Sequence, residues 1–209
     1  MSKSAKAPGE FWDRRYDGDD YVFGQDPNLW MASHESLLTE GMTALVPGDG
    51  EGRNGVWLAE RGLVVTTVDA SQVGVEKAQY LAAARGVEIN TQIADLRDWN
   101  PPKSTFDLAV LAFVHVDVDE RTAVHHRVAE TLKPGGLLLL EGFSPDHLGY
   151  GRGGPSDKIM MFTEAGLRED FADMLDIEHL AEVKTVIPDS ERHGGPAMVV
   201  QLRGRRKNR

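Results

Sequence analysis

The sequence contains no cysteine among its 209 residues. This absence excludes disulfides, thiolate metal sites and cysteine nucleophiles, and it fits a reducing compartment. There is also no run of about 18 apolar residues, so the sequence offers no transmembrane helix. Aromatic residues are few, at 7%. Basic residues are outnumbered by acidic ones, 23 to 33, and the net charge of −10 argues against a large nucleic-acid-binding surface.

The remaining composition, 41% hydrophobic and 27% charged, is that of an ordinary soluble protein. The length predicts a single domain with a sizeable core. The polar stretch Met1–Gly9 lacks the apolar core of a secretory signal, so we expect residues 1–10 to form a disordered tail. Residues 204–209 are expected to form a basic tail, which leaves one domain over residues 11–203. We expect a cytoplasmic protein without a metal ion.

Short apolar runs alternate with helix-like segments through the first two thirds of the sequence. Strands are predicted over residues 43–46, 64–68, 88–92, 108–112 and 137–141, and helices over residues 54–61, 73–85 and 122–132. Alternation of this kind indicates right-handed βαβ units around a parallel sheet. The Lys-Pro-Gly-Gly sequence at Lys133–Gly136 is a typical stop signal for the last of these helices.

The rhythm of the sequence changes after residue 150. A helix is predicted over residues 162–174, with Thr163 as its N-cap. Two strand-like runs follow, residues 178–187 and 197–203, and two strands in succession indicate an antiparallel pair at one edge of the sheet. The predicted fold is therefore α/β: a Rossmann-like sheet of seven strands, mostly parallel, with an antiparallel C-terminal edge pair and helices on both faces.

The most informative segment is residues 44–55, where an apolar strand leads into a glycine turn and then a helix. Glycine permits the sharp turn and the close approach of a ligand, and the helix N-terminus directs N–H groups toward it. This arrangement is typical of nucleotide-like cofactor sites in α/β sheets. Residues 50–55 match G-x-G-x-x-G, a dinucleotide fingerprint, whereas Gly48, Gly50 and Gly52 form the G-x-G-x-G of S-adenosylmethionine (SAM) sites.

Two carboxylates follow successive strands and bear on this choice. Asp69 ends the second predicted strand, where it can accept hydrogen bonds from both hydroxyls of a ribose, in NAD and SAM alike. Asp95 follows the third strand and can accept the exocyclic amino group of an adenine. Because a dinucleotide site has no standard acid at the second position, the pair favours SAM. The fourth strand ends near Phe113, which can face a substrate, and His115, a candidate general base.

These motifs in their order resemble class I SAM-dependent methyltransferases. The resemblance spans roughly residues 11–203, and the Gly-Arg-Asn ending of the turn with the helix Phe162–Phe171 is similar to the tellurite-resistance and thiopurine methyltransferase group. The motifs that carry it are Gly48–Asn54, Asp69, Ala94–Leu96, Phe106–Asp107 and Leu132–Gly136.

The resemblance implies roles for individual residues. The glycines would wrap the methionine and ribose, Asp69 would hold the ribose, and Ala112 would offer backbone to the methionine amino group. The full set that it assigns to SAM is Gly48, Gly50, Gly52, Asp69, Ala70, Asp95, Leu96 and Ala112. One position departs from the family: Val46 stands where an acid usually anchors the methionine ammonium. Asp49 and Glu51 are the candidates to replace it.

The segment before the first strand is rich in aromatic residues, five of which lie within thirteen positions of residues 11–23. In methyltransferases such a segment often forms a lid over the cofactor, and aromatic faces can surround a sulfonium. We expect a lid over about residues 11–40, with Tyr16 and Arg15 at the cofactor and Tyr21 and Phe23, together with Phe113, at the substrate. The alternative is a hydrophobic staple that seals the edge of the sheet.

The predicted function is SAM-dependent methylation of a small molecule, namely a thiol, chalcogen oxyanion, phenol or amine, by in-line transfer. A phenol or amine would benefit from a general base, for which His115, Arg192 and His193 are the candidate catalytic residues. We expect no nucleic-acid or membrane partner and a monomer or homodimer. Two alternatives stay open: an NAD-dependent oxidoreductase, given the dinucleotide fingerprint, and a non-catalytic SAM-binding protein, given Val46.

Overall fold

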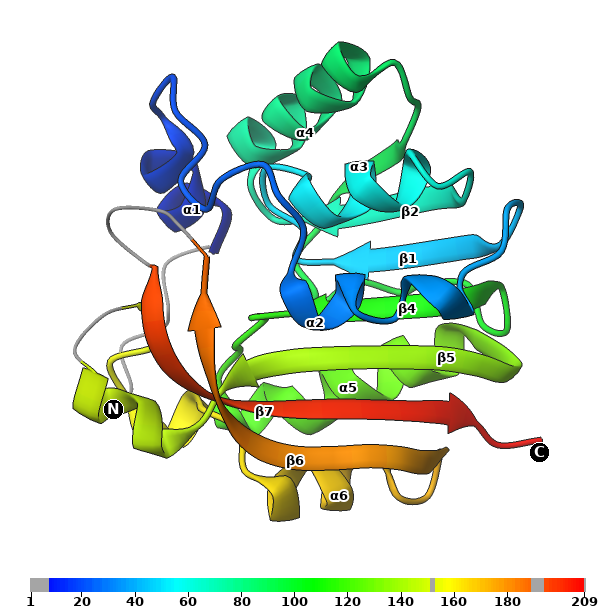
Figure 1. Cartoon of the computed structure of the whole chain (residues 1–209), viewed down its shortest axis with the longest axis vertical. Coiled ribbons are helices and arrows are strands. Elements are labelled where there is room, and N and C mark those ends of the chain that lie inside the picture. Colours follow the sequence, from blue (N-terminus) through cyan, green and yellow to red (C-terminus); the bar gives the residue numbers. More distant parts are fainter. Residues whose placement is uncertain (1–7, 151–152, 189–193, 209) are drawn as a thin grey trace.

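The computed structural model describes residues 8–150, 153–188 and 194–208. One seven-stranded sheet in the order β3-β2-β1-β4-β5-β7-β6 forms its centre (Figure 1). The first five strands run parallel and β7 runs antiparallel to both β5 and β6, so the predicted sheet is confirmed. The strands are β1 (Thr43–Pro47), β2 (Val64–Asp69), β3 (Asn90–Ile93), β4 (Phe106–Ala112), β5 (Leu132–Phe143), β6 (Leu175–Ile187) and β7 (Gly195–Arg206).

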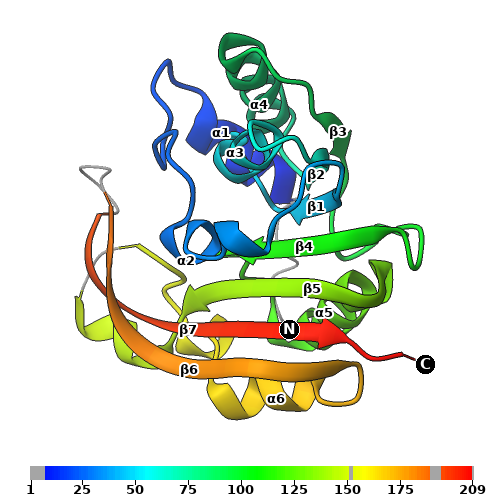
Figure 2. The same cartoon turned by 45° about the vertical axis from the view of Figure 1, so that its right-hand side comes forward.

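Helices cover both faces of this sheet, as predicted. In Figures 1 and 2, α2 lies in front of the sheet, α5 and α6 lie behind it, and α1 lies beside α4. In the part of the chain that the structure describes, no helix has the length and apolar character needed to cross a membrane. The helices are α1 (Pro8–Tyr16), α2 (Leu29–Ala32), α3 (Arg53–Ala59), α4 (Gln72–Arg85), α5 (Val118–Thr131) and α6 (Glu164–Phe171), with 3-10 turns at Glu35–Leu37, Pro145–Tyr150 and Lys158–Met160.

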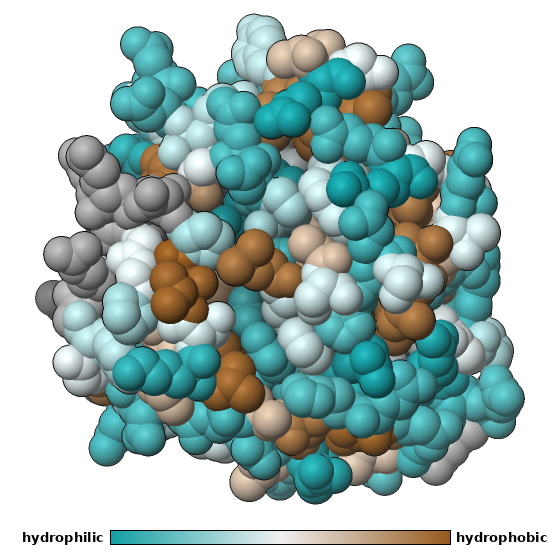
Figure 3. All heavy atoms as spheres, in the orientation of Figure 1, coloured by the Kyte–Doolittle hydropathy of each residue, from teal (hydrophilic) through white to brown (hydrophobic). Residues whose placement is uncertain are grey.

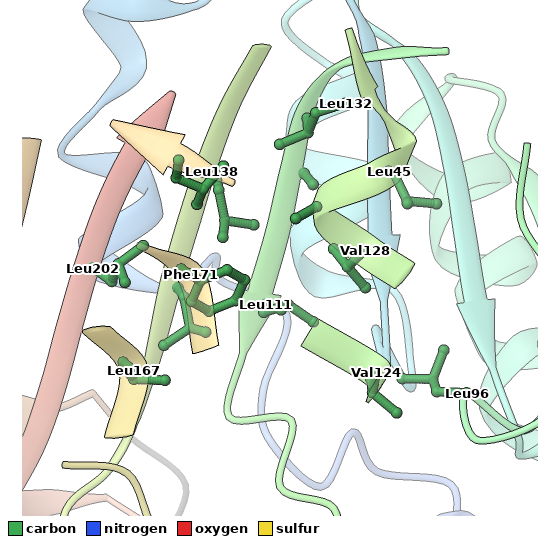
Figure 4. Close-up of a cluster of buried hydrophobic side chains, with 14 of the residues drawn as sticks. Leu45, Leu96, Leu111, Val124, Val128, Leu132, Leu138, Leu167, Phe171 and Leu202 are labelled. Atoms are coloured by element: carbon green, nitrogen blue, oxygen red, sulfur yellow. The ribbon is translucent and has the colours of Figure 1, made fainter. Parts of the chain in front are cut away.

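Alternation along the strands divides the apolar side chains between two cores. On one face Leu45 and Leu138 pack with Val128 of α5 and Phe171 of α6 (Figure 4). On the other face the neighbouring residues of the same strands pack against α2 and α3, and Val46 is fully buried there. A side-chain period of two explains why adjacent strand residues serve opposite cores. Both cores hold the carboxyl ends of β1 and β4 in fixed positions.

Several element boundaries differ from the sequence-based expectation. Strand β5 begins at Leu132 rather than Leu137, because Leu132 pairs with Phe106 ahead of an irregularity in the register. Helix α5 begins at Val118, four residues earlier than predicted, with two acids in its first turn. Helix α6 is shorter than predicted, and helix α1 begins at Pro8, within the stretch expected to be a tail.

The strand order places a crevice at the carboxyl ends of β1 and β4. From β1 the chain builds outward through β2 and β3, then returns to place β4 on the opposite side of β1. Open α/β sheets bind their ligands at such a switch point. The glycine turn follows β1 directly, Asp69 ends β2, and Ala112 ends β4, so the topology brings these predicted site residues to one edge of the sheet.

Candidate cofactor and acceptor site

The glycine turn after β1 is built as the sequence predicts. Gly48, Gly50 and Gly52 have φ values of +67°, +56° and +91°, which side chains rarely adopt. Gly52 is also the N-cap of α3, and a Cβ there would lie 2.6 Å from the Cβ of Ala78 on α4. The turn therefore requires glycine both for its backbone conformation and for close packing of α3 against α4.

Asp69 closes this turn from the end of β2. Its Oδ2 accepts a hydrogen bond from the Gly50 N–H at 2.8 Å, and its Oδ1 accepts one from the Ser71 N–H at 2.8 Å. Burial raises the pKa of Asp69 above its usual value, against the effect of these backbone bonds. A carboxylate has about four acceptor positions, and those that the backbone N–H groups leave unused are available to ribose hydroxyls. The neighbouring Ala70 faces α1, since a Cβ on Gly9 would lie 2.5 Å from the Ala70 carbonyl oxygen.

The two acids proposed to replace the one missing at Val46 have other contacts. Asp49 is buried and accepts hydrogen bonds from the backbone N–H groups of Asn54 and Gly55, so it caps the start of α3. Burial raises the pKa of Asp49 to about 7. Glu51 accepts a bond from the Val22 N–H and pairs with Lys77 at 2.8 Å. Glu51 therefore fastens the N-terminal segment to α4.

Helix α1 covers the glycine turn. Tyr16 is buried, and its hydroxyl oxygen lies 2.5 Å from the position that a Cβ on Gly50 would take. Trp12 stacks on Tyr16 with ring centroids 5.4 Å apart. Asp13 accepts bonds from the Ser71 hydroxyl and the Val73 N–H, and so holds α1 to the start of α4. The N-terminal segment thus lies at the cofactor edge of the sheet, where the sequence places the lid.

The chemistry of this region fits a cofactor with a sulfonium and a ribose. Three carboxylates act on Tyr16: burial, followed by the charges of Asp69, Glu51 and Asp49, raises the pKa of its phenol. The charge of Asp13 helps to raise the pKa of Asp69. An excess of buried negative charge favours a cationic ligand, and Asp69 supplies the acceptor set for vicinal hydroxyls. Asp69 and Tyr16, both predicted from the sequence to contact the cofactor, thus lie together at the glycine turn.

The expected adenine-binding residues lie beyond β3. Asp95 forms a bidentate ion pair with Arg97, with a shortest N–O distance of 2.6 Å, and hydrogen bonding to Arg97 lowers the pKa of Asp95. Leu96 is buried and belongs to the same hydrophobic core as Leu45. Asp95 is thus ionised and oriented by its neighbour, whereas the side chain of Leu96 is packed in the core.

The predicted substrate residues fall into two groups. Tyr21 donates its hydroxyl hydrogen to the Lys77 carbonyl, and Phe23 packs near Trp12 at 6.2 Å, so both belong to the lid. The guanidinium of Arg15 lies 5.9 Å from the Phe23 ring centroid, also in the lid. Phe113, in contrast, lies at the end of β4 with a φ of +58° and lines a cavity.

His115 is held by two backbone bonds. Its Nε2 accepts from the Phe143 N–H at 3.1 Å and its Nδ1 lies 3.0 Å from the Met160 carbonyl oxygen, which fixes the hydrogen on Nδ1. Burial lowers the pKa of His115 to about 4. Both ring nitrogens are engaged, so this geometry favours a packing role over that of a general base. Arg192 and His193, the other predicted catalytic residues, lie outside the described residues.

The cavity that Phe113 lines contains residues that the sequence analysis did not identify. It measures about 220 Å³ and lies between α2 and the ends of β5, β6 and β7. Its polar lining consists mainly of Asn28, Arg53, Glu141 and Gln201. Glu141 had one detectable signal in the sequence, since it is a charged residue at the end of the apolar run Leu137–Leu140.

Comparisons with known proteins agree with this fold. Residues 44–136 match the methyltransferase domain family, a stretch of less than half the chain. No curated protein sequence matches the chain significantly. Among solved structures, one described by the conversion of a disulfide bond into a thioacetal group during echinomycin biosynthesis is 21% identical with a TM-score of 0.79, covering 95% of this chain and 91% of that chain.

Two further structures share the fold. A SAM-dependent methyltransferase from Methanosarcina mazei is 20% identical with a TM-score of 0.69, covering 87% of this chain and 99% of that chain. TehB from Haemophilus influenzae is 17% identical with a TM-score of 0.71, covering 95% of this chain and 67% of that chain. At these identities the likeness shows the fold, and the methyltransferase assignment comes from the matched domain.

The buried acids predict a pH dependence that distinguishes SAM from S-adenosylhomocysteine (SAH), which lacks the sulfonium charge. Because the pKa of Asp49 is raised to about 7, its carboxyl is neutral below that pH and negative above it. Asp69 shifts in the same direction. If the sulfonium charge shifts the pKa of these carboxyls by about half to one unit, the ratio of SAM to SAH affinity changes about three- to tenfold. The preference for SAM over SAH should therefore rise by this factor between pH 5.5 and 8.5. Paired calorimetric titrations would measure this ratio, and a flat or falling ratio would contradict the electrostatic argument.

Proposed function

We propose that this protein, a SAM-dependent methyltransferase by its domain and fold, transfers the methyl group to a small-molecule acceptor by in-line displacement. The observation that carries the proposal is the adjacency of two compartments. An acidic glycine turn lies under helix α1, and a cavity of about 220 Å³ is lined by Arg53, which directly follows the turn, and by Phe113. One compartment suits the cofactor and the other suits an acceptor.

When bound, the cofactor supplies an activated methyl group on a positively charged sulfur. The chain then has to orient the two reactants and exclude water, and proximity of this kind supplies a large part of such a rate enhancement. Asp69 would hold the ribose, and Asp95 with Leu96 would receive the adenine. Tyr16 and its aromatic neighbours in the segment of residues 11–40 would act as the lid over the sulfonium.

The size of the cavity supports a small acceptor. Cavities for drug-sized ligands usually measure about 300–1,000 Å³, so 220 Å³ suits one small molecule or the reacting end of a larger one. The likeness to TehB and the Gly-Arg-Asn ending of the turn keep thiols and chalcogen oxyanions, the acceptors of the tellurite-resistance and thiopurine group, among the candidates beside phenols and amines.

Turnover would be tested by following SAH release from the protein with SAM and a panel of small thiols, phenols, amines and chalcogen oxyanions. We expect acceptor-dependent SAH formation with at least one class. Binding of SAM without turnover across the whole panel would instead favour the non-catalytic alternative. Enhancement of NADH fluorescence on mixing, without a response to SAM, would favour the oxidoreductase.

A further inference from the structure

The cavity beside the glycine turn has a polar end and an apolar mouth. Glu141 and Arg53 lie at the polar end, and Phe113 and Trp30 form aromatic walls. At the mouth, Leu29 and Val186 are 54% and 62% exposed. Figure 3 shows apolar surface near α2 and near the ends of β6 and β7, with a hollow between them. The cavity therefore suits a molecule with a polar head and an apolar body.

Glu141 supplies the hydrogen-bond acceptors at the polar end of the cavity. This side chain is only 5% exposed, and its two oxygens accept hydrogen bonds from Asn28 Nδ2 at 2.5 Å and Gln201 Nε2 at 2.7 Å. Both partners are neutral amides, so they fix the carboxylate in place without cancelling its charge. Each oxygen retains a further acceptor position. A buried carboxylate in this state favours a cationic hydrogen-bond donor.

The hydrogen-bond donors of the polar end come from Arg53. The Arg53 guanidinium has five N–H groups. Within the described residues it donates one hydrogen bond, from Nη1 to the Phe23 carbonyl oxygen at 3.1 Å. Trp30 Nε1 is buried with no hydrogen-bond partner in the part of the chain that the structure describes. Buried unpaired donors are rare in folded proteins and call for an explanation. Both side chains line the cavity, and the remaining N–H groups of Arg53 can donate to an anionic or carbonyl oxygen there. The Trp30 ring packs on that of His179, 4.9 Å away, whose Nε2 is also without a partner among the described residues.

The cavity also adjoins the cofactor edge. Arg53 follows Gly52 directly, and Ala112 is paired with Glu141 in the sheet. The Phe113 N–H donates to the Glu141 carbonyl oxygen at 2.7 Å. The left-handed backbone of Phe113 is costly for an aromatic residue. These contacts tie the polar end of the cavity to the strand end where the methionine part of the cofactor is expected.

We propose that this cavity selects a zwitterionic amine as methyl acceptor, with its ammonium group on Glu141 and its carboxylate on Arg53. This inference rests on the proposed function. In the transfer, the acceptor N–H proton goes to the Glu141 carboxylate and the freed nitrogen lone pair forms the new N–C bond. The S–C bond breaks as the N–C bond forms, and its electron pair stays on sulfur. Burial raises the pKa of Glu141, which suits it to accept this proton.

The test uses three matched probes on the protein saturated with SAH: 4-(aminomethyl)benzoate, benzylamine without the carboxylate, and 4-methylbenzoate without the amine. Calorimetry or saturation-transfer NMR should show the zwitterion binding at least tenfold more tightly than either truncated probe. Glu141→Gln should remove the preference for the zwitterion over 4-methylbenzoate. Arg53→Met should remove the preference over benzylamine.

The pair Glu60→Gln and Arg85→Met provides a control, since these residues form an exposed ion pair elsewhere in the chain. Both control variants should retain the full preference. SAH binding by each variant verifies its fold and separates this proposal from the proposed function. Absence of SAH binding by the unaltered protein would refute the proposed function. Equal binding of the three probes, absence of binding by all of them, or an unaltered preference in both cavity variants would overturn the zwitterion proposal alone.

Discussion

Replacing Asp69 by asparagine is expected to weaken SAM binding about 100-fold or more. The carboxylate ends β2 and receives N–H bonds from Gly50 and Ser71 while keeping acceptor positions for two ribose hydroxyls. Hydrogen bonds to a charged group contribute about 1.5–3 kcal/mol each. When both bonds are weakened, the loss of binding free energy is about 3 kcal/mol or more. Each 1.4 kcal/mol changes the affinity tenfold. Isothermal titration of the variant with SAM measures this loss.

Asp107→Asn is the matched control for that experiment. Asp107 also accepts a hydrogen bond from a backbone N–H, that of Thr43 at 2.9 Å, but it lies near the start of β4, at the opposite end of the sheet. Both variants lose one carboxylate charge, so a general effect of charge or folding would appear in both. The account predicts that Asp107→Asn keeps the parental SAM affinity. A folded Asp69→Asn protein that binds SAM within threefold of the parent would refute the assigned role of Asp69.

Gly52→Ala is expected to lower the free energy of unfolding by about 2–5 kcal/mol. The φ of +91° at Gly52 strains any side chain by about 1–2 kcal/mol. A Cβ there would also lie 2.6 Å from the Cβ and 2.7 Å from the Cα of Ala78. Since a backbone atom of α4 cannot turn aside, α3 and α4 would have to separate, and overpacking of this kind costs about 1–3 kcal/mol. Urea denaturation, monitored by circular dichroism, measures this loss of unfolding free energy.

Gly86→Ala separates the two contributions to that loss. Gly86 caps the C-terminus of α4 with a φ of +71°, and a Cβ there would have no atom within 4 Å. This control carries the backbone strain without the clash, so its loss should be about 1–2 kcal/mol. Equal losses in the two variants would mean that the contact between Gly52 and Ala78 is not what requires glycine in the turn.

The sheet and the glycine turn could be predicted because their signals are local. Apolar runs of strand length alternate with helical segments, and this fixes a parallel sheet with Asp69 and Ala112 at one edge. The glycine spacing identified the turn itself. Boundaries were less accurate: the Lys133–Gly136 stretch reads as a helix stop, yet Leu132 already pairs with Phe106 and carries β5 past it.

The cavity could not be predicted because its parts are remote in the sequence. Asn28 contacts Glu141 across 113 positions, and Gln201 reaches Glu141 from 60 positions away. Residue spacing in the sequence does not predict such a cluster, because the cluster forms only when β7 takes its place in the sheet. Val46 shows that a feature visible in the sequence can still need the structure for its interpretation. Its departure from the family was visible in the sequence, but only the structure shows that Asp49 caps α3 and that Glu51 binds Lys77.

The central claim, that the acidic glycine turn under α1 holds SAM, is tested most directly by parallel calorimetric titrations of the full chain with SAM, SAH and NAD(H). The account predicts micromolar binding of SAM and SAH and no heat of binding from NAD(H). Binding of NAD(H) alone would mean that residues 50–55 act as a dinucleotide fingerprint. Absence of binding by all of them would contradict the account and would identify Val46 as the mark of a lost cofactor site.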